Sequence, residues 1–215
     1  MNINRKELCR YLGLGNNPPD EQTDCLIDEV LSELERKVTP RFAETELSVQ
    51  RGGNIVILGG KNGMIITSRN LSANLEGCEK ALIFCATIGP APDMLIKRYS
   101  LTSIAKAAVV QAAGSAMIEA YCNQINRDFE QRYKGQFFLK PRFSPGYGDF
   151  ALEHQRDFFR LLDVEKRLGV ELSDSLLMTP CKSVTAVIGL TKEHRGCNIS
   201  HCASCDKRDC QFRLE

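Results

Sequence analysis

This sequence of 215 residues lacks an excess of positive or negative charge. Its 28 lysines and arginines almost balance its 27 aspartates and glutamates. Proteins that bind nucleic acid or an anionic membrane through their overall electric field need a surplus of positive charge. We therefore expect neither nucleic acid nor a membrane surface among the partners of this protein. Low-complexity segments and internal repeats are also absent, which excludes a solenoid or a linker.

Long apolar runs are absent as well. Residues 1–7 lead straight into charged sequence and lack the uninterrupted apolar core of a secretory signal. The longest weakly charged stretch, residues 107–126, carries Gln111 and Glu119, which the hydrocarbon of a bilayer would reject. The sequence thus predicts a soluble, cytoplasmic protein without a membrane span.

Histidine is scarce, with three residues in the whole chain, His154, His194 and His201. None of them belongs to the Ser-His-Asp or Cys-His patterns that mark nucleophilic catalysis. We assign no catalytic residue and expect any chemistry to depend on binding and orientation.

Hydrophobic periodicity divides the chain into helical and extended stretches. The spacing of apolar residues predicts helices over residues 5–12, 21–37, 103–132 and 152–168. Alternation and glycine-rich turns predict antiparallel strands between residues 42 and 67, a buried strand over 81–88 and further strands between 174 and 190.

The order of these elements predicts an α+β fold. Strands do not alternate regularly with helices, which disfavours a doubly wound parallel sheet. We divide the chain into an N-terminal helical segment (residues 1–40), an α+β body (41–192) and a cysteine-rich tail (193–215).

The most informative peptide runs over residues 140–149 and contains two prolines and two glycines. These residues impose an irregular backbone, while Arg142 and Tyr147 offer a planar cationic fork and an aromatic hydroxyl. Arginine can hold a carboxylate through two hydrogen bonds, and Gly146 lets the backbone approach a ribose or a flat ring. Two interpretations stay open: a site for a ligand such as an amino acid, or an ordinary Pro-Gly turn whose arginine forms a surface ion pair.

The pattern Arg-x-x-x-Gly-Tyr, from Arg142 to Tyr147, resembles the S-adenosylmethionine-binding signature of the activation domain of cobalamin-dependent methionine synthase. The alanine-rich helix that contains Glu119-Ala120-Tyr121 resembles the helix that precedes this signature. Residues 178–184, with Pro180, resemble the segment that follows it. Together these regions cover roughly residues 81–190, about half of the chain.

The resemblance implies a C-shaped α+β fold in which helices flank a twisted antiparallel sheet. In that family, cob(II)alamin formed by accidental oxidation is reduced by one electron and methylated from S-adenosylmethionine. By resemblance, Arg142 would hold the ligand's carboxylate, and Gly146 and Tyr147 would complete the binding turn. Glu119 would face the same cleft, although the polar stripe that it shares with Gln111 could equally be the solvated face of its helix.

The sequence shows no homocysteine, folate or cobalamin domain. We therefore expect a stand-alone activation subunit of methionine synthase that acts in trans on a cobalamin-dependent methionine synthase or a related corrinoid protein. The partner would carry the cobalamin, and a protein such as flavodoxin would donate the electron. Residues 148–150 lead directly into a helix where the family often continues with a Pro-rich segment, and the apolar residues 187–189 occupy a region where the full-length enzyme has aromatic residues. Contacts to adenine are therefore expected to differ.

Four of the ten cysteines form a cluster of the type C-x4-C-x2-C-x4-C: Cys197, Cys202, Cys205 and Cys210. Thiols this dense in a reducing compartment favour a bound metal over disulfides. Zinc and an iron–sulfur cluster both stay open, because the first three cysteines have a spacing known in ferredoxins and the fourth lies too close for that pattern. The other six are expected to be reduced and mostly buried.

Two competing functions follow from the same residues. A non-catalytic metal or iron–sulfur adaptor of a corrinoid methyltransferase system would use the tail as its active element and would ignore S-adenosylmethionine. A general S-adenosylmethionine methyltransferase of another fold is disfavoured, because no Gly-rich strand-to-helix loop followed by an acidic residue is evident. A mixed sheet with a parallel core would favour that third function.

Overall fold

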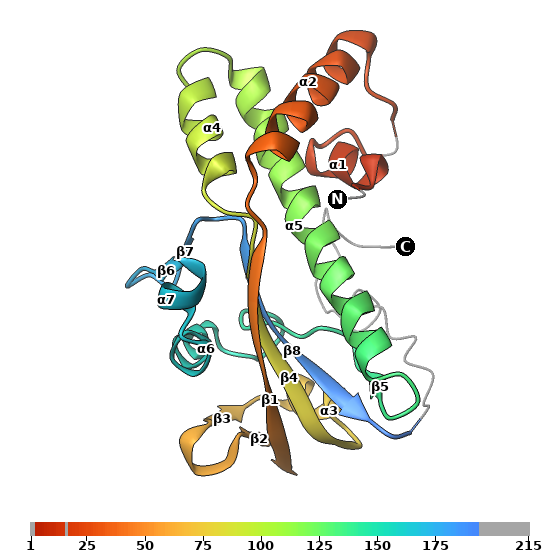
Figure 1. Ribbon diagram of the computed structural model, residues 1–215, viewed down its shortest axis with the longest axis vertical. Coiled ribbons are helices and arrows are strands. Elements are labelled where there is room, and N and C mark those ends of the chain that lie inside the picture. The colour runs from red at the N-terminus through yellow and green to blue at the C-terminus, as the bar shows by residue number, and fades with distance from the viewer. Residues whose placement is uncertain (1–2, 16, 194–215) are drawn as a thin grey trace.

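An antiparallel sheet of six strands organises the computed structural model, which describes residues 3–15 and 17–193 (Figure 1). The strand order is β3-β2-β1-β4-β8-β5, and every described pairing is antiparallel. The strands are β1 (Arg41–Gly52), β2 (Ile55–Leu58), β3 (Met64–Thr67), β4 (Cys78–Thr87), β5 (Phe138–Leu139) and β8 (Ser183–Thr191). Two short strands, β6 (Glu171–Leu172) and β7 (Met178–Thr179), pair separately.

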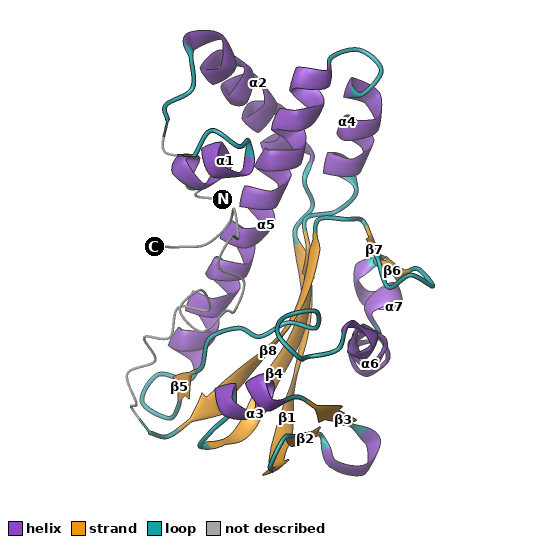
Figure 2. Ribbon diagram, turned by 180° about the vertical axis from the view of Figure 1, so that it is seen from behind, coloured by secondary structure: helices purple, strands orange, loops and turns teal. Residues whose placement is uncertain are grey.

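Helices cover both faces of this sheet. Four of them share one hydrophobic core: α1 (Arg5–Tyr11), α2 (Glu21–Lys37), α4 (Ala91–Tyr99) and α5 (Ile104–Arg132). Three others pack against the opposite face: α3 (Arg69–Asn74), α6 (Gln155–Leu162) and α7 (Val164–Leu168). Figures 1 and 2 show α5 on one side of the strands and α6 with α7 on the other. Short 3-10 turns span Gly60–Asn62 and Leu152–His154.

The central strand β4 explains why the sheet is buried on both sides. Leu82, Phe84 and Ala86 contribute to the core under α5, whereas Ala81, Ile83 and Cys85 contribute to the core under α6 and α7. Successive side chains of a strand point to opposite faces, so a strand covered on both faces becomes an apolar run. The sequence prediction of an α+β fold with an antiparallel sheet and flanking helices is therefore confirmed.

Helix α5 is the long element that positions the candidate site. Its 29 residues begin after Ser103, whose hydroxyl caps the first turn by accepting from the Lys106 backbone N–H. Small residues line its buried side, among them Ala112, Ala113 and Gly114. They allow neighbouring elements to approach closely, so α5 packs against α1, α2, α4 and the sheet.

One sequence prediction differs from the structure in detail, and another, that the single cysteines are mostly buried, is confirmed with two exceptions. The helix expected over residues 152–168 is interrupted at Asp163, which has a left-handed φ of 51° and separates α6 from α7. Of the six single cysteines, Cys25 and Cys181 are exposed, and the other four are buried as expected. Cys25 lies on the outer side of α2, and Cys181 precedes β8, so neither side chain enters a core. No helix among residues 3–15 and 17–193 is both long and apolar enough to cross a membrane.

Candidate functional site

The turn that carries Arg142 is attached to the edge of β8. The Lys140 backbone N–H donates to the Gly189 carbonyl at 2.8 Å, and Phe143 exchanges two backbone hydrogen bonds with Val187 at 2.9 and 2.8 Å. The chain from β5 to Phe143 therefore continues the sheet by one irregular strand. The sequence indicated a turn here but contained no signal for its pairing with β8.

This attachment directs neighbouring side chains to opposite faces of the sheet. Phe143 is buried in the core under α6 and α7, where its ring stacks on that of Phe150 with 6.2 Å between the centroids. The preceding residue, Arg142, projects to the α5 side, as the alternation of an extended segment requires. Burial of Phe143 thus determines where the guanidinium lies.

The guanidinium of Arg142 contacts the polar stripe of α5, which consists of Gln111, Ser115, Glu119 and Asn123. Its Nη2 donates to Oε2 of Glu119 at 3.1 Å and to Oδ1 of Asn123 at 3.0 Å. The side chains of Arg142 and Glu119 are 20% and 34% exposed, so the pair is only partly accessible to water. The Nη1 of Arg142 is buried and has no hydrogen-bond partner within the described part of the chain.

A second basic side chain, that of Lys182, contacts the same stripe one turn earlier on α5. Lys182 is buried, and its Nζ donates to the Ser115 hydroxyl at 2.9 Å. Burial lowers the pKa of Lys182. The Pro-containing segment recognised in the sequence therefore lies against the helix that carries Glu119. Three of the four stripe residues thus contact side chains from other elements: Ser115, Glu119 and Asn123.

The far end of the turn is held by Asp149, which the sequence did not single out. Its carboxylate accepts from the Ser68 hydroxyl at 2.5 Å and from the backbone N–H groups of Arg69 at 2.7 Å and Asn70 at 3.1 Å. Burial alone would raise the pKa of Asp149, but these hydrogen bonds outweigh burial and lower it. Asp149 thereby ties the turn to the first residues of α3.

The two glycines of the turn, Gly146 and Gly148, both have a positive φ but differ in their surroundings. Gly148 has a left-handed φ of 55°, and a Cβ there would lie 2.3 Å from the Nδ2 of Asn70, so a larger residue would be strained and would displace the Asn70 side chain. Gly146 is exposed, has a φ of 93°, and donates its N–H to the Phe150 carbonyl at 2.7 Å. The Tyr147 side chain is 63% exposed. The structure thus places Arg142 and Glu119 in contact, with Gly146 and Tyr147 on the outer surface of the same turn.

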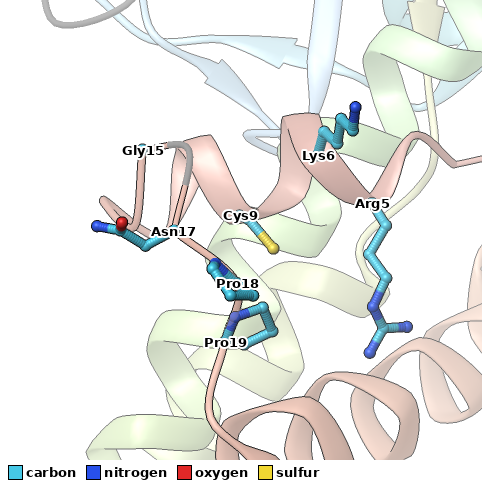
Figure 3. A pocket seen from close by; sticks show the side chains of 7 residues that line it. All are labelled: Arg5, Lys6, Cys9, Gly15, Asn17, Pro18 and Pro19. Atoms are coloured by element: carbon cyan, nitrogen blue, oxygen red, sulfur yellow. The ribbon is translucent and has the colours of Figure 1, made fainter.

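A separate cavity of about 440 Å³ lies between α1 and the segment that leads to α2 (Figure 3). It is lined by residues such as Arg5, Cys9 and Pro19, and it contains none of the predicted site residues. Arg5 is already paired with Asp24 and Asp28, both at 2.6 Å. We therefore do not place the ligand in this cavity.

The predicted metal ligands cannot be placed. Cys197, Cys202, Cys205 and Cys210 lie outside the described residues. Among the described residues, no group of three or more histidine, cysteine or acidic side chains is arranged to hold a metal ion.

The fold is similar to that of a solved domain. The crystal structure of the MetH reactivation domain bound to AdoHcy superposes with a TM-score of 0.68 and 16% sequence identity, covering 90% of this chain and 75% of that one. At this level of identity the likeness concerns the fold. No curated protein matches the sequence.

The family is shown by the sequence match. The family described as "Vitamin B12 dependent methionine synthase, activation domain" matches residues 102–212, which is more than half of the 215 residues. This chain belongs to that family. The family performs S-adenosylmethionine-dependent methylation of cobalamin and acts with the cobalamin-dependent methionine synthase.

Proposed function

We propose that this protein binds S-adenosylmethionine between the Arg142 turn and α5, and supports reductive methylation of cob(II)alamin on a separate methionine synthase or related corrinoid protein. The observation that carries this proposal is the contact between Arg142 and Glu119, in which Nη1 of Arg142 has no partner among the described residues. A buried N–H without an acceptor costs about 1–3 kcal/mol, so this group favours a ligand that brings one.

The charges of the pair match the amino-acid end of the ligand. A carboxylate can accept from Nη1 of Arg142, while the neighbouring ammonium group can donate to the carboxylate of Glu119. Each charge of the pair then gains a further partner without losing those it has. The left-handed Gly146 leaves backbone accessible beside the site, and the exposed ring of Tyr147 supports the bound pose.

The chemistry requires binding and orientation from this chain. In the proposed reaction, a donor such as flavodoxin would give one electron to the corrinoid of the partner. The reduced corrinoid would supply the electron pair for the new bond to the methyl group, and the sulfonium would leave as a neutral thioether. No proton moves in this transfer, so no acid or base residue is needed. Arg142, Glu119 and the turn hold the sulfonium at a defined place for the approaching partner.

The decisive experiment is an anaerobic calorimetric titration with S-adenosylmethionine. We expect saturable binding by the wild type and at least about a hundredfold weaker binding by Arg142→Ala, because a charge-assisted anchor is lost. The matched control is Arg127→Ala, which removes an arginine of α5 itself whose Nη2 donates to Oε1 of Gln124 at 2.8 Å within the same helix. Failure of the wild type to bind, or equal binding by wild type and Arg142→Ala, would contradict the proposal.

The role in trans needs its own assay. Wild-type protein added to a separate cobalamin-dependent methionine synthase trapped as cob(II)alamin, with an electron donor and S-adenosylmethionine, is expected to restore turnover. Arg142→Ala is expected to fail. We assign this reaction to the cytoplasm, since the six described single cysteines are all free thiols, as in a reducing compartment.

We also propose that the tail (residues 193–215) is a metal-binding appendage to the helical segment (1–40) and the α+β body (41–192). Four thiolates suit zinc or an iron–sulfur cluster. Elemental analysis and visible absorption of anaerobically purified protein distinguish zinc from an iron–sulfur cluster. Replacement of the four cysteines by serine is expected to remove the metal. If metal is bound but S-adenosylmethionine is not, the adaptor function replaces the first proposal.

A further inference from the structure

Lys182 reaches the polar stripe of α5 from the interior of the protein. The residue is only 5% exposed, and its backbone carbonyl accepts from the Ile88 N–H at 3.2 Å, next to the end of the β4–β8 pairing. Its stem passes the notch that Gly114 leaves in α5, because a Cβ at position 114 would lie 3.0 Å from Cε of Lys182. The buried stem thus carries the ammonium group to Ser115, which is partly exposed.

Two features of this arrangement oppose stability. Glycine in a helix interior is less stable than alanine, and a buried ammonium group loses its hydration. Burial accordingly lowers the pKa of Lys182, although the negative charge of Asp93 opposes this shift. Within the described part of the chain no carboxylate forms an ion pair with Nζ, and the two oxygens of Asp93 accept from the N–H and thiol of Cys181 at 2.8 and 2.5 Å. Packing alone therefore does not explain a lysine here, and such local conflicts are typical of functional sites.

The hydrogen bonds at Nζ define which ligand group fits beside it. The Ser115 hydroxyl donates to the Gln111 carbonyl at 3.0 Å, so its oxygen accepts from Nζ at 2.9 Å and keeps a second lone pair. Ser115 takes one of the three N–H groups of the Lys182 ammonium. The two residues thus offer a donor and an acceptor side by side. A hydroxyl group both donates and accepts and fits this pair, whereas a carboxylate only accepts.

Lys182 and Ser115 lie one helical turn from the residues that we propose as the anchor of the ligand. Ser115 precedes Glu119 by four residues, which is about 6 Å along the helix axis. In the function proposed above, Arg142 and Glu119 take the charged amino-acid end of S-adenosylmethionine. The rest of an extended ligand can then lie along the same stripe. The ribose is the part of that remainder that carries hydroxyl groups.

We propose that Lys182 and Ser115 form a ribose subsite, in which Nζ donates to a hydroxyl oxygen of the S-adenosylmethionine ribose and the Ser115 oxygen accepts from a ribose hydroxyl. This inference rests on the proposed function of the Arg142 turn and names the part of the ligand that lies along α5. Lys182 then distinguishes adenosyl ligands from other sulfonium amino acids, because only adenosyl ligands bring a ribose. The pattern from Arg142 to Tyr147 does not include this residue.

A cycle between protein and ligand variants tests this subsite on the full chain. Anaerobic calorimetry measures the affinity of wild type and Lys182→Met for S-adenosylmethionine and for its 2′-deoxy and 3′-deoxy analogues, with millimolar ligand for weak binders. We expect wild type to bind at least one deoxy analogue about tenfold more weakly than S-adenosylmethionine, because a hydrogen bond from a charged donor is lost. Lys182→Met should discriminate against that analogue by less than about twofold.

Two further variants separate ligand binding from folding. Methionine keeps the apolar stem without the buried charge, so Lys182→Met should unfold at the same or a higher urea concentration than wild type. Ser115→Ala leaves the lysine in place and removes the acceptor, and it should lower the discrimination to about threefold or less. The matched control is Lys106→Met, which removes a lysine of α5 that pairs with Glu29 at 2.5 Å. It should keep both the affinity and the discrimination.

The outcomes separate this inference from the proposed function. Equal discrimination by wild type, Lys182→Met and Ser115→Ala would overturn the ribose subsite, and so would a wild type that binds all three ligands equally well. Either result leaves the proposed function intact. Absence of saturable S-adenosylmethionine binding by the wild type overturns both.

Discussion

Arg142 and Glu119 lie 23 positions apart in the sequence, and their charged groups lie 3.1 Å apart in the structure. Neither residue is buried deeply enough for the pair to be a major source of stability, because partly exposed ion pairs contribute about 0–1 kcal/mol. In the function proposed above their arrangement matters more for ligand binding, since it presents one cation and one anion to the two charged groups of an amino acid.

The first prediction concerns the charge of Glu119. Glu119→Gln keeps an oxygen acceptor for Arg142 but removes the negative charge that meets the ligand's ammonium. We expect S-adenosylmethionine to bind about tenfold more weakly, because a charge-assisted hydrogen bond becomes a neutral one. Asn123→Ala removes only a second acceptor of Arg142 and serves as the control. Calorimetry that finds equal affinities for wild type and Glu119→Gln would exclude Glu119 from the site.

The second prediction concerns Asp149, which ties the turn to α3. Asp149→Asn keeps the shape but loses charged acceptors for Ser68 and two backbone N–H groups, so we expect about 1–2 kcal/mol lower free energy of unfolding at pH 7. Because the folded-state pKa of Asp149 is below its ordinary 3.8, its stabilisation is present above that value and is lost as the pH falls through the lower folded pKa.

Urea unfolding at several pH values measures this effect. The difference between wild type and Asp149→Asn should be constant from about pH 5 to 7 and should shrink below about pH 4. The control is Asp128→Asn on α5, where the Asp128 carboxylate accepts one hydrogen bond from Nε2 of Gln124 at 2.8 Å. This substitution should change the free energy of unfolding by less than about 0.5 kcal/mol. A pH-independent difference for Asp149→Asn would show that its charge is not what holds the turn.

The third prediction concerns Gly114, where α5 passes over the buried stem of Lys182. A Cβ at position 114 would lie 3.0 Å from Cε and 3.3 Å from Cγ of Lys182. Alanine gains about 1 kcal/mol over glycine in a helix, whereas overpacking costs about 1–3 kcal/mol. We expect Gly114→Ala to lower the free energy of unfolding in the wild type and to cost less in a Lys182→Ala background, where the 3.3 Å approach to Cβ of Pro92 remains. The same loss in both backgrounds would place the crowding elsewhere.

The fourth prediction concerns the reactivity of Cys181. Partial burial raises the pKa of this thiol to about 11, and its hydrogen bond to Asp93 at 2.5 Å adds to the shift. Because the thiolate is the reactive form, we expect slow alkylation at pH 8 although the residue is exposed. Asp93→Asn should accelerate it at least about threefold, since the neighbouring negative charge is removed. Peptide mapping of iodoacetamide labelling measures the alkylation rate of Cys181 in the wild type and in Asp93→Asn, with the exposed Cys25 as the internal reference. Equal Cys181 rates in the two proteins would contradict the role of Asp93.

Local patterns predicted much of the fold. The apolar periodicity of residues 21–37 predicted α2 with both of its ends, and the helix predicted over residues 103–132 matches α5 to within one residue. The break at Asp163 was not predicted, because an aspartate in the left-handed region leaves no mark on an apolar pattern that continues through it. The pairing of Phe143 with Val187 was missed for a related reason: a single bridge has no periodicity to detect.

The sequence by itself determined helices α1, α2 and α5, the antiparallel character of the sheet and the motif from Arg142 to Tyr147, because these depend on residues close together in the chain. Only the tertiary structure decided that Arg142 reaches Glu119 and that Asp149 anchors the turn on α3. These contacts join residues up to 81 positions apart. They exist because burial of apolar side chains such as Phe143 brings distant segments together, and no local pattern records which polar groups then meet.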